Sequence, residues 1–200
     1  MDIIDNIPIY YINLNRSTER NTMILNTFKE YGITNYKRVE AIDGTLENFK
    51  DKYETELSNK HISCSLSHVK AIQSAYNDNC DYAIIMEDDC NFEYLKYKKI
   101  PIIDMFKKID DCEILQLSFA WASFKELNLV SKNYNIIKEY SKGYKPCACA
   151  YMINKNGMIK IIKSYLIDKT RPEKYRRSYK FPEIIKDDNP NIVSVKYHHA

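Results

Sequence analysis

Two short apolar runs, each followed at once by polar or charged residues, constrain the fold of this chain most strongly. The first covers 7–14 (IPIYYINL) and precedes NRSTER, and the second covers 82–86 (YAIIM) and precedes Glu87, Asp88 and Asp89. Both runs are rich in β-branched or aromatic residues and predict buried strands. The second contains no polar residue, which is typical of a central strand covered on both faces.

Apolar residues at helical spacing follow the first strand. Ile24, Phe28 and Tyr31 share one face of a predicted helix, and Gly32 stands where that helix ends. A short strand over 36–39 comes next. Strand, helix and strand in this order predict a βαβ unit with parallel strands and a right-handed crossover.

The remaining chain continues the alternation of helices and strands. Further helices are predicted over 63–76, over 102–109 and from a cap at Asn154 or Asn156, with strands over 113–119, 148–153 and 192–195. This alternation predicts an α/β sandwich with a mostly parallel central sheet. Ligands of such sheets bind outside the carboxyl ends of the strands, a rule that selects 13–20 and 87–90.

The carboxylates of Glu87, Asp88 and Asp89 repel one another at the end of a buried strand. A divalent cation such as Mg²⁺ or Mn²⁺ removes that cost. Residues two apart in an extended backbone point the same way, so Glu87 and Asp89 are the predicted metal ligands, with Asp88 pointing elsewhere. The alternative is a solvated acidic turn without a metal.

Arg16 and Arg20 follow the first strand, where Ser17 is the expected N-cap of the helix. Four residues apart at a helix start, the two arginines are predicted to share a face. There they could bind a diphosphate together with the free backbone N–H groups of the helix N-terminus. The alternative is a pair of surface charges, one of them paired with Glu19 or Glu30.

Cys64 and His68 are one helical turn apart, which makes thiol–imidazole catalysis conceivable. The sequence identifies no acid to orient the imidazole. A polar helix start near the active face is the favoured interpretation of Ser67 and His68.

Length and charge exclude several other classes of protein. The 200 residues fit a single domain over 1–200, and the net charge of +3 is spread out, unlike that of a nucleic-acid binder. The sequence contains no run of 18 apolar residues, so it predicts no membrane span. The N-terminus lacks a leader pattern, so we expect a cytoplasmic protein (host cytoplasm for a viral chain) whose six cysteines are mostly reduced.

Several motifs in a fixed order resemble glycosyltransferase family 25, which includes lipooligosaccharide and collagen galactosyltransferases. They lie within 7–165 and are Tyr11-Ile12-Asn13-Leu14-Asn15-Arg16 with Arg20, Ala41-Ile42-Asp43-Gly44, Cys64-Ser65-Leu66-Ser67-His68, Tyr82 to Asp89, and Ala150-Tyr151-Met152-Ile153 with Gly157. The resemblance implies a GT-A-type, Rossmann-like α/β/α fold and inverting transfer of a hexose, galactose or glucose, to a glycan or hydroxylysine hydroxyl. It also implies a UDP-sugar donor and Mn²⁺ or Mg²⁺.

The resemblance also implies roles for single residues. Glu87 and Asp89 would bind the metal, and the donor site would comprise Asn13, Leu14, Arg16, Arg20, Asp43, Ser67, His68 and Asp88. The chain diverges from the family over 166–200, where the candidates for the catalytic base are Asp168, Glu183 and Asp188. Two alternatives follow: a catalytically degenerate binding or assembly module, and another nucleotide-dependent transferase. The scarcity of glycine, four in all, argues against a phosphate-binding glycine loop.

Overall fold

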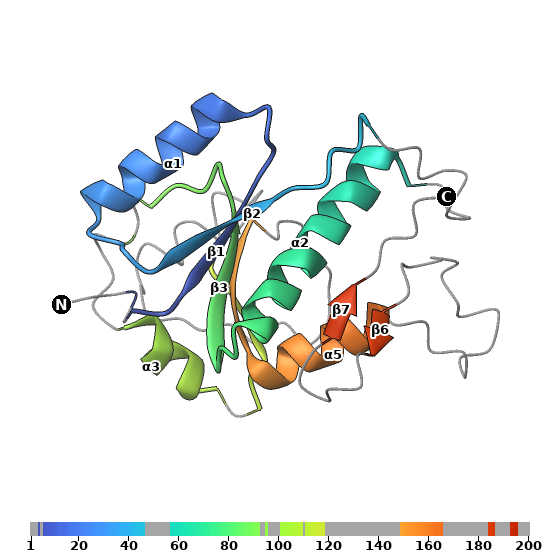
Figure 1. Ribbon diagram of the computed structural model, residues 1–200. Coiled ribbons are helices and arrows are strands. Elements are labelled where there is room, and N and C mark those ends of the chain that lie inside the picture. The colour runs from blue at the N-terminus through green and yellow to red at the C-terminus, as the bar shows by residue number, and fades with distance from the viewer. Residues whose placement is uncertain are drawn as a thin grey trace, which may run out of the picture.

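A five-stranded sheet, ordered β2-β1-β3-β5-β4, forms the centre of the protein in the computed structural model (Figure 1). The structure describes residues 4, 6–46, 57–92, 95, 101–109, 111–118, 149–165, 184–186 and 193–195. The strands of the sheet are β1 (Ile9–Asn13), β2 (Tyr36–Glu40), β3 (Tyr82–Glu87), β4 (Ile114–Gln116) and β5 (Ala150–Asn154). β1 pairs in parallel with β2 and β3, whereas β5 runs antiparallel to β3 and β4. The mostly parallel sheet is therefore confirmed.

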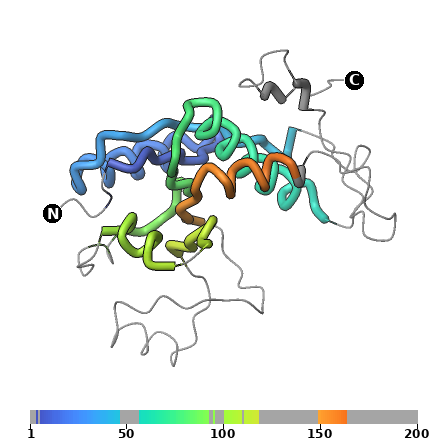
Figure 2. The backbone as a smooth tube through the Cα atoms, turned by 90° about the horizontal axis from the view of Figure 1, so that it is seen from below, coloured from blue at the N-terminus to red at the C-terminus, as the bar shows by residue number. Residues whose placement is uncertain are grey.

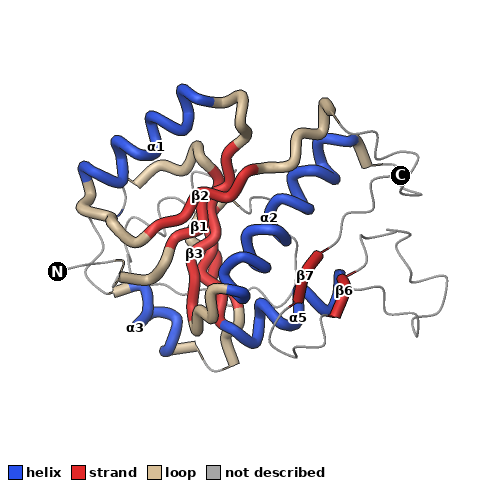
Figure 3. Tube along the Cα trace, viewed as in Figure 1, coloured by secondary structure: helices blue, strands red, loops and turns tan. Residues whose placement is uncertain are grey.

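Helices cover both faces of this sheet, as Figures 1 and 3 show. One face carries α1 (Thr18–Glu30) and α3 (Ile102–Lys107), and the other carries α2 (Asn59–Asn77) and α5 (Lys155–Tyr165). Figure 2 shows α5 beside α2. The arrangement confirms the predicted α/β sandwich.

Alternation along the strands divides the core into two halves. Ile84 and Met86 pack toward α1 and α3, whereas Ala83 and Ile85 pack toward α2 and α5. All four side chains are at most 4% exposed. Because both faces of β3 are covered, an uninterrupted apolar run is the sequence that this position requires.

Local signals in the sequence explain where helices begin and end. Gly32 has a φ of 68°, the left-handed conformation that ends α1. Ser17 holds the N-cap position of α1 but makes no side-chain capping bond. At α5 the Gly157 N–H donates to Asn154 Oδ1 at 2.8 Å, which selects Asn154 over Asn156.

The helix predicted over 63–76 begins earlier, at Asn59. Ser58 caps this first turn, where its Oγ accepts a hydrogen bond from the His61 N–H. Since the added turn lacks apolar periodicity, only the cap could have revealed it. The expected last strand is present as β7 (Val193–Val195) and pairs antiparallel with β6 (Ile184–Lys186), which was not predicted. None of the described helices has the length and apolar character needed to cross a membrane.

Burial in the core predicts that the same substitution, Met to Ala, changes stability by very different amounts at two positions. Met158 of α5 is 0% exposed and Met23 of α1 is 67% exposed. Met158→Ala should lower the free energy of unfolding by about 2–5 kcal/mol, because it removes buried atoms and leaves a cavity. Met23→Ala should change it by less than about 0.5 kcal/mol. Urea denaturation followed by circular dichroism measures both, and equal losses would contradict this description of the core.

Candidate functional site

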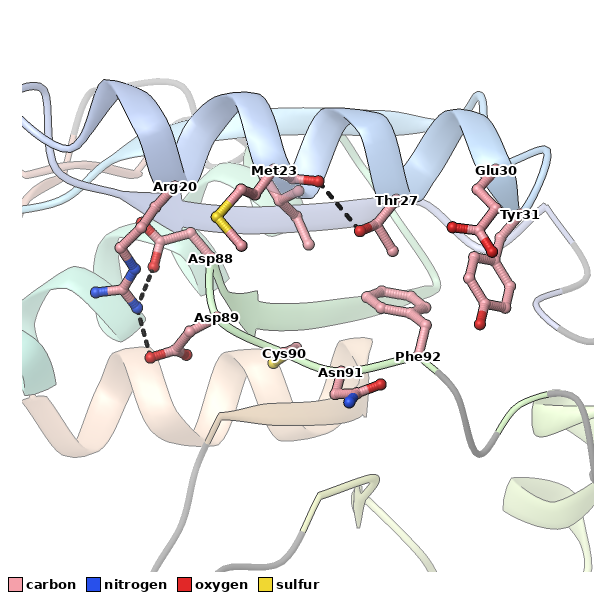
Figure 4. Close-up of a pocket in the computed structure, with 11 residues that line it drawn as sticks. Arg20, Met23, Thr27, Glu30, Tyr31, Asp88, Asp89, Cys90, Asn91 and Phe92 are labelled. Carbon is pink, nitrogen blue, oxygen red and sulfur yellow. Dashed lines mark hydrogen bonds and ion pairs between the residues drawn. The ribbon is translucent and has the colours of Figure 1, made fainter.

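The turn that follows β3 carries an acidic pair held by one arginine (Figure 4). Asp88 is only 8% exposed, and its carboxylate accepts a hydrogen bond from Asn13 Nδ2 at 2.6 Å. Arg20 Nη2 lies 2.6 Å from Asp88 Oδ1 and also contacts Asp89. A buried carboxylate needs such partners, and here they come from β1 and α1.

The three acidic residues are grouped differently from the sequence-based expectation. Glu87 ends β3 on the face of α2, where His68 Nε2 lies 3.6 Å from its Oε1. Asp88 and Asp89 share Arg20 on the face of α1. The predicted common direction of Glu87 and Asp89 is wrong, because the extended backbone stops at Glu87 and a turn replaces it.

Asn13 connects three parts of the site. Its side-chain amide donates to Asp88 and to the Ser17 carbonyl at 3.1 Å, and its Oδ1 accepts from Arg38 Nε at 2.9 Å. The side chain is almost fully buried, so these bonds satisfy an amide that water does not reach. The next residue, Leu14, is half-buried, and its carbonyl accepts from the Ser17 N–H at 2.9 Å.

Arg16 binds a different carboxylate from Arg20. It precedes α1, which begins at Thr18, so the two arginines do not share a helical face as predicted. Arg16 Nε lies 2.6 Å from Asp43 Oδ2. The Arg16 guanidinium and the hydroxyl and N–H groups of Thr45 hold the pKa of Asp43 well below its usual range. At neutral pH Asp43 is therefore a fixed negative charge beside the loop after β1.

Ser67 positions the segment that carries Asp43. Its Oγ donates to the Ser63 carbonyl at 2.6 Å and accepts from the Ile42 N–H at 2.8 Å. Gly44 is required at the next turn, because a Cβ there would come within 2.6 Å of the Asn59 carbonyl oxygen. The close approach of this turn to α2 excludes any side chain at position 44.

His68 lies on the other face of the sheet in a mostly buried position. Its Nδ1 is 3.2 Å from Tyr151 Oη, and its Nε2 faces Glu87. Burial lowers the pKa of His68, but the neighbouring Cys64 and Glu87 raise it to about 9 overall. The His68 imidazole in turn lowers the pKa of Glu87, against the effect of burial.

A cavity of about 410 Å³ opens between α1 and the turn after β3 (Figure 4). Arg20, Asp88 and Asp89 line one end, and Tyr31 and Phe92 line the other. The cavity has a charged end and an aromatic end, which suits a ligand that has both a charged part and an apolar or aromatic part.

Sequence reasoning missed Arg38 and Glu40 near the carboxyl end of β2. Arg38 contacts Asn13 and Asn15, and Asn15 also contacts Glu40. The rule that selects the carboxyl ends of strands would have found both if it had been applied to 36–40 as well. The predicted candidates for the base, Asp168, Glu183 and Asp188, lie outside the described residues.

Fold and site together define a class: an α/β protein that gathers arginines, carboxylates and an amide at the carboxyl ends of parallel strands. The model of "Glycosyltransferase family 25 (LPS biosynthesis protein)" matches residues 6–171. The chain belongs to glycosyltransferase family 25, and the resemblance found in its motifs is confirmed.

Two relatives carry glycosyltransferase names. A "Glycosyltransferase 25 family member" of Aedes aegypti is 23% identical over 180 residues, which cover 82% of this chain and 29% of the relative. A protein of Acanthamoeba polyphaga mimivirus with a provisional glycosyltransferase name is 32% identical over 99 residues. This match covers 45% of the present chain and 31% of the viral protein. The chain therefore spans less than a third of the length of either relative.

The pairing of His68 with Glu87 predicts a measurable pKa change. In the Glu87→Gln variant without metal, the pKa of His68 should fall below about 9, because one of the two neighbours that raise it is neutralised while Cys64 and the effect of burial remain. NMR titration of the imidazole protons measures this. Glu113→Gln, which removes a carboxylate paired with Lys160 instead, is the matched control and should leave His68 unchanged.

The same pairing predicts how stability depends on pH. Since folding raises the pKa of His68, its contribution to the free energy of unfolding is fully present below pH 6.5 and is lost as the pH rises through about 9. The wild type should lose this increment over that range, whereas Glu87→Gln should lose less. Identical pH profiles for the two proteins would contradict the pairing.

Proposed function

We propose that this chain transfers a hexose, galactose or glucose, from a nucleoside diphosphate donor to a hydroxyl group of a glycan or a protein. The observation that carries the proposal is the pair of arginine–carboxylate contacts at one edge of the sheet, Arg16 with Asp43 and Arg20 with Asp88 and Asp89. Membership of glycosyltransferase family 25 supports it. UDP is the nucleotide that the resemblance favours.

Arg16 and Arg20 are the groups that would bind the diphosphate. Their side chains are 60% and 44% exposed, although each is paired with carboxylates. Guanidinium groups form strong, directed hydrogen bonds with phosphate oxygens. Both arginines can keep their positions near β1 and turn part of their hydrogen-bonding capacity toward the donor.

The acidic turn fits a hard divalent cation such as Mn²⁺ or Mg²⁺. Its donor atoms are all carboxylate oxygens, which these ions prefer. The Asp89 side chain is 55% exposed and offers accessible oxygens, whereas the buried Asp88 holds the turn to Asn13 and Arg20. Asp89 would hold the ion with Asp88 beside it, and Glu87 adds negative charge from the other face. When bound, the cation would stabilise negative charge on the diphosphate.

Transfer then requires an oxygen nucleophile and a base. The acceptor hydroxyl attacks the anomeric carbon from the side opposite the diphosphate and forms the new glycosidic bond. The bond from that carbon to the diphosphate oxygen breaks, and its electron pair leaves with the nucleotide. A carboxylate accepts the hydroxyl proton, a role for which Asp168, Glu183 and Asp188 are the proposed candidates. Configuration at the anomeric carbon is inverted.

Removing the charge of Asp89 tests the proposed cation site. Asp89→Asn should lower kcat/KM for release of nucleotide from UDP-galactose or UDP-glucose, with Mn²⁺ present, by about a hundredfold or more. Asp104→Asn, the same change at an exposed position of α3, should retain activity. Undiminished turnover in Asp89→Asn would contradict the proposal, and donor binding without turnover in the wild type would favour a binding module.

Removing one arginine at a time tests the phosphate contacts. Arg16→Gln and Arg20→Gln should each weaken UDP binding about tenfold to a hundredfold, because each loses a charge-assisted hydrogen bond of about 1.5–3 kcal/mol. Lys29→Gln, at the opposite end of α1, removes one positive charge without touching the site and should bind UDP like the wild type. Calorimetric titration measures all three, and equal affinities would refute the assignment.

A further inference from the structure

Three side chains of the kinds that bind transition metals meet between α2 and the end of β3. Cys64 Sγ, a ring nitrogen of His68 and a carboxylate oxygen of Glu87 all lie within 4.8 Å of one another. Cys64 and His68 are separated by one turn of α2, so they project from the same face of the helix toward Glu87. No second group of this kind occurs among the described ranges of the chain.

The nitrogen at the centre of this group lacks a hydrogen bond. His68 is 9% exposed, and its Nε2 is buried without a partner among the described residues. Glu87 Oε1 lies 3.6 Å away, beyond hydrogen-bonding distance. A buried polar atom without a partner is costly, and a ligand that bonds to it removes that cost.

The other ring nitrogen is already held in the way that metal-binding histidines require. His68 Nδ1 lies 3.2 Å from Tyr151 Oη, and the two rings stack with centroids 5.7 Å apart. Such a partner fixes the orientation of the ring and leaves Nε2 directed at the ligand. Tyr151 comes from β5, which pairs with β3 next to Glu87, so the sheet itself positions the imidazole.

Sulfur, nitrogen and oxygen donors together favour Zn²⁺ over Mg²⁺ or Mn²⁺. Tetrahedral Zn²⁺ with ordinary bond lengths separates its ligand atoms by about 3.4–3.6 Å, and the His68–Glu87 distance of 3.6 Å fits this spacing. Cys64 is exposed and gives an ion a path from solvent. Three protein ligands leave a fourth position for water.

We propose that Cys64, His68 and Glu87 form a binding site for Zn²⁺ or a similar transition metal, separate from the Asp88–Asp89 turn. The two sites lie on opposite faces of the sheet and differ in chemistry: one offers a thiolate, an imidazole and a carboxylate, and the other only carboxylates. An ion bound there would tie α2 to the end of β3 and bring a water molecule to the edge of the sheet where the functional site lies.

Cobalt provides a spectroscopic test that does not depend on sugar transfer. The full chain is freed of metal with a chelator and titrated with Co²⁺ above neutral pH, where protons compete less for the ligands. We expect one equivalent of Co²⁺ to give a thiolate-to-cobalt charge-transfer band and intense visible bands of a tetrahedral site. Zn²⁺ should abolish both signals. Oxygen and nitrogen sites elsewhere in the chain cannot produce the thiolate band.

Variants assign the bands to this site. Cys64→Ser, a small change at an exposed position, should remove the charge-transfer band, and His68→Gln should weaken Co²⁺ binding at least about tenfold. Tyr151→Phe keeps all three ligands but removes the partner of His68, and should weaken binding about tenfold to a hundredfold. Circular dichroism confirms that each variant is folded.

Two controls separate this site from other cysteines and from the acidic turn. Cys112→Ser and Asp89→Asn should both retain the wild-type cobalt spectrum and affinity. The proposal is overturned if the wild type gives no thiolate band, or if the band survives in Cys64→Ser. Because the assay contains no nucleotide or sugar, its result is independent of whether the chain proves to be a glycosyltransferase.

Discussion

The hydrogen bond between Asn13 and Asp88 is the interaction on which the candidate functional site, at the carboxyl ends of β1 and β3, depends. It joins the ends of β1 and β3 at 2.6 Å in a buried position, and the same amide contacts Ser17 and Arg38. A buried carboxylate without such partners would be strongly destabilising. This hydrogen bond fixes the turn after β3. That turn carries Asp88 and Asp89, the two carboxylates that Arg20 contacts. The exposed side chains of Arg20 and Asp89 are therefore attached to a turn that buried polar contacts hold in place.

The sheet also places neighbouring acidic side chains on opposite faces. At the end of β3 the alternation of side chains sends Glu87 toward His68 on α2 and Asp88 toward Arg20 on α1. Three consecutive carboxylates thus avoid sharing one site, which reduces their mutual repulsion. The carboxylates at this edge therefore have different partners, His68 for Glu87 and Arg20 for Asp88 and Asp89.

Sequence patterns predicted most elements of the described fold, because apolar periodicity reflects burial directly. They failed where another interaction decided the outcome. Residues 59–62 extend α2 through the cap at Ser58, and Arg16 lies before α1 because the helix begins only at Thr18. Arg38 was missed because the rule that selects the carboxyl ends of strands was not applied to β2, and its exposed sequence alone does not reveal the contact with Asn13.

By itself, the sequence determined the α/β alternation, the edge of the sheet that carries the polar residues, and the family, because periodicity and motif order are properties of the chain alone. Only the tertiary structure decided which side chains meet. Cys64, His68 and Glu87 come together from separate elements, as do Asn13, Arg20 and Asp88. Strand pairing and helix packing set these contacts, since spacing along the chain does not define distance between elements.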